Sequence, residues 1–457
     1  MELYQVGMLD PVVVLTCAIV LWKYGRVSAL HPGPVYLLFH ILVVSWRVDS
    51  VLGGSSTLFS TWGHGALPVG QDELAWAATL ADVALMVMTA AWVKVAADDR
   101  RRHPIPRHDM TCDATAALLS ERVIWIVGAI AAPIGVIALF YFGNTGEAGV
   151  YKVDLGDWNS SSWTMVTQSW TGLVLLSLIY YYGFRKVLMV PMGCYLLVMA
   201  VQGFDRFRVI LPLLYLLFVW LSRTGRKWPP LWMAGAAFGV LLLFFPMKTI
   251  GNMVQRGQPI SDIADVTSNI VSDVTSGRAD DQLILDEFAS TMSLVDNSHR
   301  YFYGTLYYPL LTVAIPKQWW GDKPAVNWYM REISTPSRPM ARAGMVPTLL
   351  GESYANFGIT GIIIVTFMSA YYLGRFYFTA MRSSYVSVYR FSYIMVACTL
   401  IQVFRDGLIS LFMFTLVNMS PLVVIAVLSW FSFRRSPVWR YAPARIELLR
   451  GKGAGGV

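Results

Sequence analysis

Arginine and carboxylate side chains gather in a segment of sequence STPSRPMARAGMVPTLLGESYANFGITG. Arg338 and Arg342 carry planar guanidinium groups that suit bidentate contacts with phosphate, and Glu352 follows ten residues after Arg342. A carboxylate beside arginines can serve as a general base for a hydroxyl group, although Glu352 can also be an ordinary carboxylate at a helix start. Glycines in the same segment permit tight turns and close helix approach. We predict that this cluster binds an anionic, phosphate-bearing substrate.

Two short turns between apolar runs carry further arginines. The first, QGFDRFRVILP, holds Asp205, Arg206 and Arg208, and the second, VFRDGLIS, holds Arg405 and Asp406. Charges beside a membrane span are costly and indicate function. Asp205 can pair with one arginine of the first turn, which leaves the other arginine for a ligand. In the second turn, Arg405 can contact a ligand, or Arg405 and Asp406 can form a local ion pair that caps the following helix.

Two histidines are candidates for chemistry of a different kind. His299 lies in a loop before the aromatic segment YFYGTLYYPLL, where it can act as a base or a phosphate contact, or be a surface residue. His40 lies within an apolar run, so we expect it to form a hydrogen bond with a neighbouring helix. The sequence contains no CxxC motif and no Cys/His cluster, so we expect neither a metal site nor a cofactor.

The composition indicates which elements must position these residues. Of the 457 residues, 56% are hydrophobic and 14% are charged, against about 25% charged in soluble domains. The long apolar runs exclude a soluble enzyme, a disordered protein and a nucleic-acid-binding protein as first interpretations. We therefore predict an all-α polytopic membrane protein whose residues 1–457 form one membrane domain.

Eleven segments are apolar and long enough to be candidate membrane-spanning helices. They are approximately 8–22, 33–46, 73–93, 123–143, 162–183, 187–202, 208–221, 231–247, 357–374, 391–404 and 408–430. Residues 248–356 form a single long loop between the eighth and ninth crossings. The loop has an acidic first half with an amphipathic helical pattern, and an aromatic middle part suited to a membrane interface.

The distribution of Lys and Arg predicts the orientation of the chain. With the N-terminus outside, 22 of the 36 Lys and Arg residues fall in six segments on the inner side, which are 23–32, 94–122, 184–186, 222–230, 375–390 and 431–457. This distribution is typical of the positive-inside rule and places the C-terminus inside. The formal net charge of +8 is then explained by anionic lipid headgroups, and no nucleic-acid partner is expected.

Three motifs together resemble the O-antigen polymerase (Wzy-type) family of oligosaccharide repeat unit polymerases. They are GESYANFGITG, the aromatic stretch YFYGTLYYPLL and the stretch IPKQWWGDKP, all within or after the long loop. The resemblance implies a GT-C-like glycosyltransferase in the bacterial inner membrane, with its active site facing the periplasm. It also implies metal-independent, inverting transfer of glycans linked to undecaprenyl diphosphate. A chain-length regulator protein is a possible partner.

The resemblance also implies roles for particular residues. The expected diphosphate contacts are Arg206, Arg208, Arg342 and Arg405, with Arg338 in reserve. Glu352 is the expected general base, with His299 as the second choice. Tyr354 and Asn356 can bind sugar hydroxyls or pack the turn.

Three other functions remain open. An O-antigen ligase would use the same donor and transfer glycan to lipid A core. A flippase or transporter of lipid-linked oligosaccharide would place ionisable residues near the membrane midplane, where these spans look poor in charge. A scaffold of a polysaccharide assembly complex is the fourth possibility.

Overall fold

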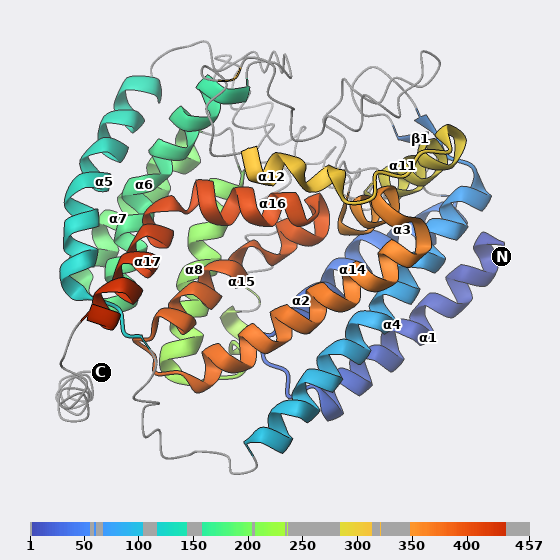
Figure 1. The fold of residues 1–457 in the computed structure, drawn as a ribbon, viewed down its shortest axis with the longest axis horizontal. Coiled ribbons are helices and arrows are strands. Elements are labelled where there is room, and N and C mark those ends of the chain that lie inside the picture. The colour runs from blue at the N-terminus through green and yellow to red at the C-terminus, as the bar shows by residue number, and fades with distance from the viewer. Residues whose placement is uncertain are drawn as a thin grey trace.

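The protein is a bundle of helices, drawn in Figure 1. The computed structural model describes residues 2–54, 59–60, 67–103, 117–143, 158–202, 206–233, 235, 284–312, 320 and 348–435. Helices α1, α4 and α14 lie side by side, and α5, α6, α7 and α17 form another group (Figure 1). Two short strands, β1 (Phe59–Ser60) and β2 (Leu67–Pro68), pair antiparallel between α3 and α4.

The described helices follow the predicted crossings in order. The N-terminal half contains α1 (Leu3–Tyr24), α2 (Pro32–His40), the π-helix η1 (Ile41–Ser45), α3 (Trp46–Leu52), α4 (Gln71–Arg102), α5 (Glu121–Gly143), α6 (Trp158–Tyr182), α7 (Lys186–Gln202) and α8 (Arg206–Thr224). The C-terminal half contains α11 (Ile284–Ser298), the 3-10 turn η5 (Thr305–Tyr307), α12 (Tyr308–Thr312), α14 (Thr348–Arg382), α15 (Val388–Asp406), α16 (Leu408–Phe412), the π-helix η6 (Met413–Asn418) and α17 (Ser420–Arg435).

Local sequence explains where several helices begin and end. The ring nitrogen Nδ1 of His31 accepts a hydrogen bond from the Gly33 amide at 2.9 Å, and Pro32 follows it at the first helical position of α2. Ser387 caps α15 by accepting a hydrogen bond from the Arg390 amide at 3.1 Å. Helix α4 carries acidic residues in its first turn and three arginines in its last, which suits the helix dipole.

Five helical segments of the described chain are long and apolar enough to cross a membrane. They are Leu3–Tyr24, Pro32–Leu52, Gln71–Arg102, Glu121–Phe140 and Thr348–Arg382. A bent pair, Leu408–Asn418 and Ser420–Phe433, makes a sixth if it forms one span. The chain is thus an all-α membrane protein, and the count of eleven crossings stays a prediction. Most of the expected eighth crossing, 231–247, lies outside the described residues.

The segments predicted to share the inner side meet at one end of the bundle, which we call the basic end. Asp99 pairs there with Arg26 at 3.2 Å and also with Arg382. A backbone hydrogen bond joins the Ala29 amide to the Lys227 carbonyl. Further contacts bring residues 117–120 against 386–388 and Ser429, and residue 180 against 385. The described parts of 23–32, 94–122, 222–230 and 375–390 therefore lie close together, and the side of the membrane that they face stays a prediction.

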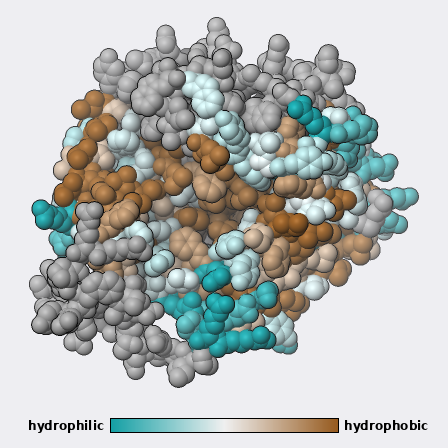
Figure 2. Space-filling view, in the orientation of Figure 1, coloured by the Kyte–Doolittle hydropathy of each residue, from teal (hydrophilic) through white to brown (hydrophobic). Residues whose placement is uncertain are grey.

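Large apolar side chains are exposed along the flanks of the bundle. On α1 they lie at three- to four-residue spacing on one face, namely Met8, Val12, Leu15, Ile19 and Trp22. Figure 2 shows apolar residues across the middle of the visible face and hydrophilic residues along its lower edge. Such a broad apolar exterior is suited to contact with lipid chains.

Part of the long loop folds back into the bundle. Helix α11 packs against α4 and α14, and eleven of its fifteen residues are buried. The described end of the predicted amphipathic stretch, residues 284–290 in α11, therefore packs against other helices at the end opposite the basic end. Residues 248–283, 313–319 and 321–347 of the predicted loop lie outside the described residues.

A buried ion pair joins α3 to α11. Arg47 Nε lies 2.7 Å from Asp286 Oδ2, and Arg47 Nη2 lies 2.8 Å from Asp286 Oδ1. Both side chains have no exposed surface. Burial raises the pKa of the Asp286 carboxyl, and the bonds from Arg47 counter that shift. The bidentate geometry fixes the start of α11 against the second membrane-spanning segment.

We expect loss of either partner to destabilise the fold strongly, because an unpaired charge is left buried. Arg47→Met or Asp286→Leu alone should lower the free energy of unfolding by about 3–5 kcal/mol, and the double variant should recover most of that loss. Denaturant unfolding in detergent micelles measures the free energy of unfolding of each variant. Arg26→Met is the control, since Arg26 is 43% exposed in its pair with Asp99 and should cost less than about 1 kcal/mol. A loss in the double variant equal to the sum of the two single losses would contradict a pair interaction.

Candidate functional site

Three segments that are distant in sequence meet at Glu352. The first is the start of α14, which ends at a break where Phe357 and Gly358 leave helical geometry. The second is the turn 301–307, whose backbone bonds to Ala355 and Asn356. The third is the turn between α15 and α16. The motifs GESYANFGITG, YFYGTLYY and RDG therefore share one location, at the opposite end of α14 from the basic end.

Glu352 is held by the start of α16. Its Oε2 accepts a hydrogen bond from the Leu408 amide at 2.7 Å, and the side chain is 1% exposed. Its Oε1 is buried and has no hydrogen-bond partner among the described residues. One carboxylate oxygen is thus anchored by the backbone, while the other retains its capacity to accept a proton or a hydrogen bond.

Gly407 makes this approach possible. Its φ is +91°, and a Cβ at this position would lie 2.1 Å from the Glu352 Cδ. Both the backbone conformation and the space therefore require glycine. Arg405 Nε and Asp406 Oδ1 are 3.7 Å apart in a partly buried pair. This is the local ion pair considered as an alternative for the RDG turn, and Glu352 accepts the hydrogen bond of the Leu408 amide at the start of α16.

Asn356 ties the aromatic turn to Glu352. Its Oδ1 accepts a hydrogen bond from the Gly304 amide at 2.7 Å, and its Nδ2 donates one to the Glu352 carbonyl at 3.0 Å. Tyr307 follows in this turn. Burial raises the pKa of its hydroxyl, and the nearby Glu352 carboxylate raises it further. The phenol is therefore protonated at physiological pH and able to donate a hydrogen bond.

The expected sugar-binding residues are engaged in contacts within the chain. Tyr354 donates to Asp296 at 2.8 Å and 2.9 Å and is 4% exposed, while Asn356 is fully buried. These contacts correspond to the alternative in which both residues pack the turn. His299 lies on the turn after α11, exposed and with φ 51°.

The remaining predicted phosphate contacts can be placed only in part. The backbones of Arg206 and Arg208 lie in the first turn of α8, whose side chains there are outside the described part. Arg338 and Arg342 lie outside the described residues altogether. Of the five expected arginines, Arg405 is the one whose side chain the structure places, on the turn that contacts Glu352.

A second polar cluster was missed by the sequence analysis. Asp10, His40 and Asp82 come from α1, α2 and α4 and meet inside the bundle. His40 forms the expected hydrogen bond to a neighbouring helix, through Nε2 to Asp10 Oδ1 at 2.9 Å. Each residue stands alone in an apolar run, and that isolation was the available signal. It also shows that the spans are less poor in charge than we inferred.

The chain was compared with protein-family models, with curated proteins and with solved structures. No family model, curated protein or solved structure matches it.

We expect Gly407→Ala to displace Glu352 and disturb the turn, because the new Cβ overlaps the carboxylate and φ is positive. The strain should cost about 1–3 kcal/mol, seen as a lower midpoint of thermal unfolding in detergent. Gly193→Ala is the matched control. Gly193 lies within α7, where an added Cβ would meet no atom within 4 Å, so the change should be neutral or slightly stabilising. Equal effects of the two substitutions would show that Gly407 is not required at the turn.

Proposed function

We propose that this protein polymerises oligosaccharide repeat units carried on undecaprenyl diphosphate. In this proposal the chain crosses the bacterial inner membrane eleven times in a GT-C-like architecture. The site around Glu352 faces the periplasm. The observation that carries the proposal is that GESYANFGITG, the aromatic turn YFYGTLYY and the RDG turn converge on one buried carboxylate at the end opposite the basic end.

The reaction assigns a role to each part of this site. An acceptor hydroxyl on one lipid-linked unit attacks the anomeric carbon of the donor glycan, forming a new C–O bond with inversion. The bond from that carbon to undecaprenyl diphosphate breaks, and the diphosphate leaves with the electron pair. Glu352 takes the hydroxyl proton on its Oε1, the atom that has no partner in the described structure. His299 is the second candidate for this role.

Arginines stabilise the charge that develops on the leaving diphosphate. Guanidinium groups bind phosphate oxygens in bidentate geometry, and positioned positive charge lowers the barrier where negative charge grows. We assign this role to Arg405, Arg206, Arg208 and Arg342, with Arg338 in reserve. Arg405 supports the assignment because its turn contacts Glu352. A chain-length regulator is the proposed protein partner, and membrane lipids surround the apolar flanks.

Two alternatives use the same membrane setting. An O-antigen ligase would share the donor and the arginines and differ in its acceptor, lipid A core. A flippase or transporter is favoured by one observation, the cluster of Asp10, His40 and Asp82 inside three helices, since ionisable groups inside membrane helices often mark transport pathways.

A reconstituted assay separates these functions. Purified protein in liposomes is mixed with the lipid-diphosphate-linked repeat unit, and the products are resolved on a gel. We expect a ladder of multiples of the unit with release of undecaprenyl diphosphate. Single transfer that depends on added lipid A core would establish the ligase. Movement of the substrate across the bilayer without any new glycosidic bond would establish the transporter.

Glu352→Gln tests the base role specifically. The glutamine oxygen can still accept the Leu408 hydrogen bond, so the fold should be retained, while the capacity to take a proton is lost. We expect polymer formation to fall by about 10²–10⁴-fold, with thermal stability close to that of the wild type. Glu352→Ala is the structural comparison, because it also leaves the Leu408 amide unpaired. Full activity in the glutamine variant would limit Glu352 to capping α16.

A further inference from the structure

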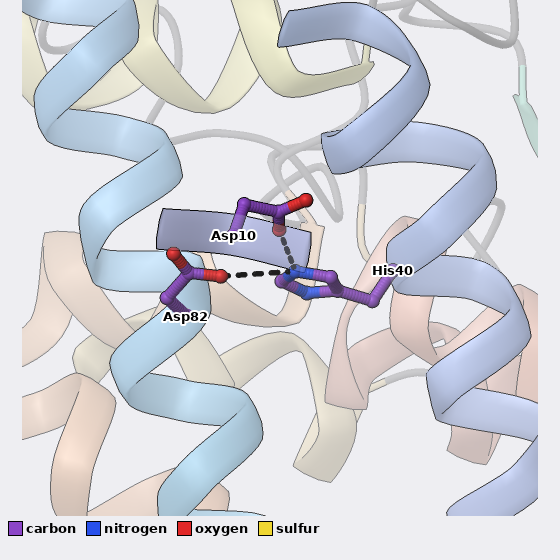
Figure 3. A group of neighbouring side chains, drawn as sticks. All are labelled: Asp10, His40 and Asp82. Carbon is purple, nitrogen blue, oxygen red and sulfur yellow. Dashed lines mark hydrogen bonds and ion pairs between the residues drawn. The ribbon is translucent and has the colours of Figure 1, made fainter. Parts of the chain in front are cut away.

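Three ionisable side chains meet within the interior of the membrane helices. Asp10 lies about two turns into α1, Asp82 about three turns into α4, and His40 at the end of α2. Asp10 is 2% exposed, Asp82 is 6% exposed and His40 is fully buried. Figure 3 shows both carboxylates directed at the same ring nitrogen of His40.

One nitrogen atom faces both carboxylates. His40 Nε2 lies 2.9 Å from Asp10 Oδ1 and 3.2 Å from Asp82 Oδ1 (Figure 3). A single N–H points along one direction, so it forms a good hydrogen bond with one of these oxygens. Asp82 Oδ1 accordingly has no hydrogen bond of acceptable geometry within the described chain. Asp82 Oδ1 is therefore a buried carboxylate oxygen that lies near His40 Nε2 without a hydrogen bond to it.

The charge of the cluster also favours a bound cation. With neutral imidazole the two carboxylates carry a charge of −2, and the hydrocarbon interior of a membrane makes an uncompensated charge very costly. A protonated imidazole would leave a charge of −1. A divalent cation neutralises the two carboxylates and is bound equally by all three groups, because its attraction has no single direction.

The distances between the possible ligand atoms fit the coordination of one metal ion. Ligand atoms about 2.1 Å from a shared ion lie roughly 3.0–3.4 Å apart in octahedral or tetrahedral geometry. The separations of His40 Nε2 from the two carboxylate oxygens fall close to this range, and the ligand atoms of all three residues lie within 4.8 Å of one another. One imidazole nitrogen with two carboxylate oxygens is a donor set suited to Zn²⁺, Mn²⁺ or Fe²⁺.

We propose that Asp10, His40 and Asp82 bind a divalent transition-metal ion that clamps α1, α2 and α4 together. The three ligand residues are remote in sequence from the turn at Glu352. The binding of the ion does not depend on the proposed glycosyl transfer. It joins the first three membrane-spanning segments through side chains alone. Bound metal should therefore raise the stability of the bundle.

The test measures metal binding to the purified full-length protein, free of any affinity tag. The protein is stripped with a chelator and titrated with Zn²⁺, Mn²⁺ or Co²⁺ alone. We expect saturable binding of one ion per chain and a rise in the midpoint of thermal unfolding. Asp82→Asn and His40→Gln should weaken binding by at least about tenfold. Asp99→Asn is the matched control, because Asp99 is a buried carboxylate on the same helix that pairs with arginines, and it should bind metal like the wild type.

The visible spectrum of Co²⁺ bound to the wild-type protein identifies the ligand atoms, so the test does not depend on whether a variant folds. Oxygen and nitrogen ligands give weak visible bands, whereas a thiolate gives an intense charge-transfer band. A thiolate band would place the ion at a cysteine and overturn the proposal. So would the absence of saturable binding of all three ions to the wild type, or unchanged binding in Asp82→Asn and His40→Gln. Failure of the polymerase assay would leave each of these results unaffected.

Discussion

Five buried carboxylates that the structure describes inside this bundle lie against compensating groups, and that requirement organises the structure. Water cannot satisfy a charge among apolar helices, so each buried carboxylate needs an arginine, a histidine or a helix start. Asp286 meets Arg47, Asp99 meets two arginines, Glu352 meets the first amide of α16, and Asp10 and Asp82 share His40. These contacts join elements that the chain separates, and they set which helices become neighbours.

Helix α4 is the element on which several of these contacts depend. It packs against α1, α11 and α14, and one of its long faces is filled with small residues that allow close approach. Asp82 lies along this helix and Asp99 near its final turn. The same helix therefore supports the candidate metal ligands in the interior and the ion pairs of the basic end.

The environment of Glu352 combines rigid support with chemical capacity. The break at Gly358 separates a short helix bearing Glu352 from the long apolar part of α14, and Tyr301 packs beside that glycine. Gly407 admits the carboxylate to the start of α16, and Asn356 secures the aromatic turn on the other side. A carboxylate fixed by one oxygen has a defined orientation for its second oxygen, which is what a general base requires.

The sequence alone determined the membrane class and the positions of most described helices. These properties are local, because apolar run length and Lys/Arg placement act through the bilayer rather than through contacts between helices. It also drew attention to Glu352, Gly358 and the RDG turn. The tertiary structure decided which of these side chains contact one another. The bond between Glu352 and Leu408 and the meeting of Asp10, His40 and Asp82 depend on helix packing, which brings together residues from distant parts of the chain, and no local pattern specifies that packing.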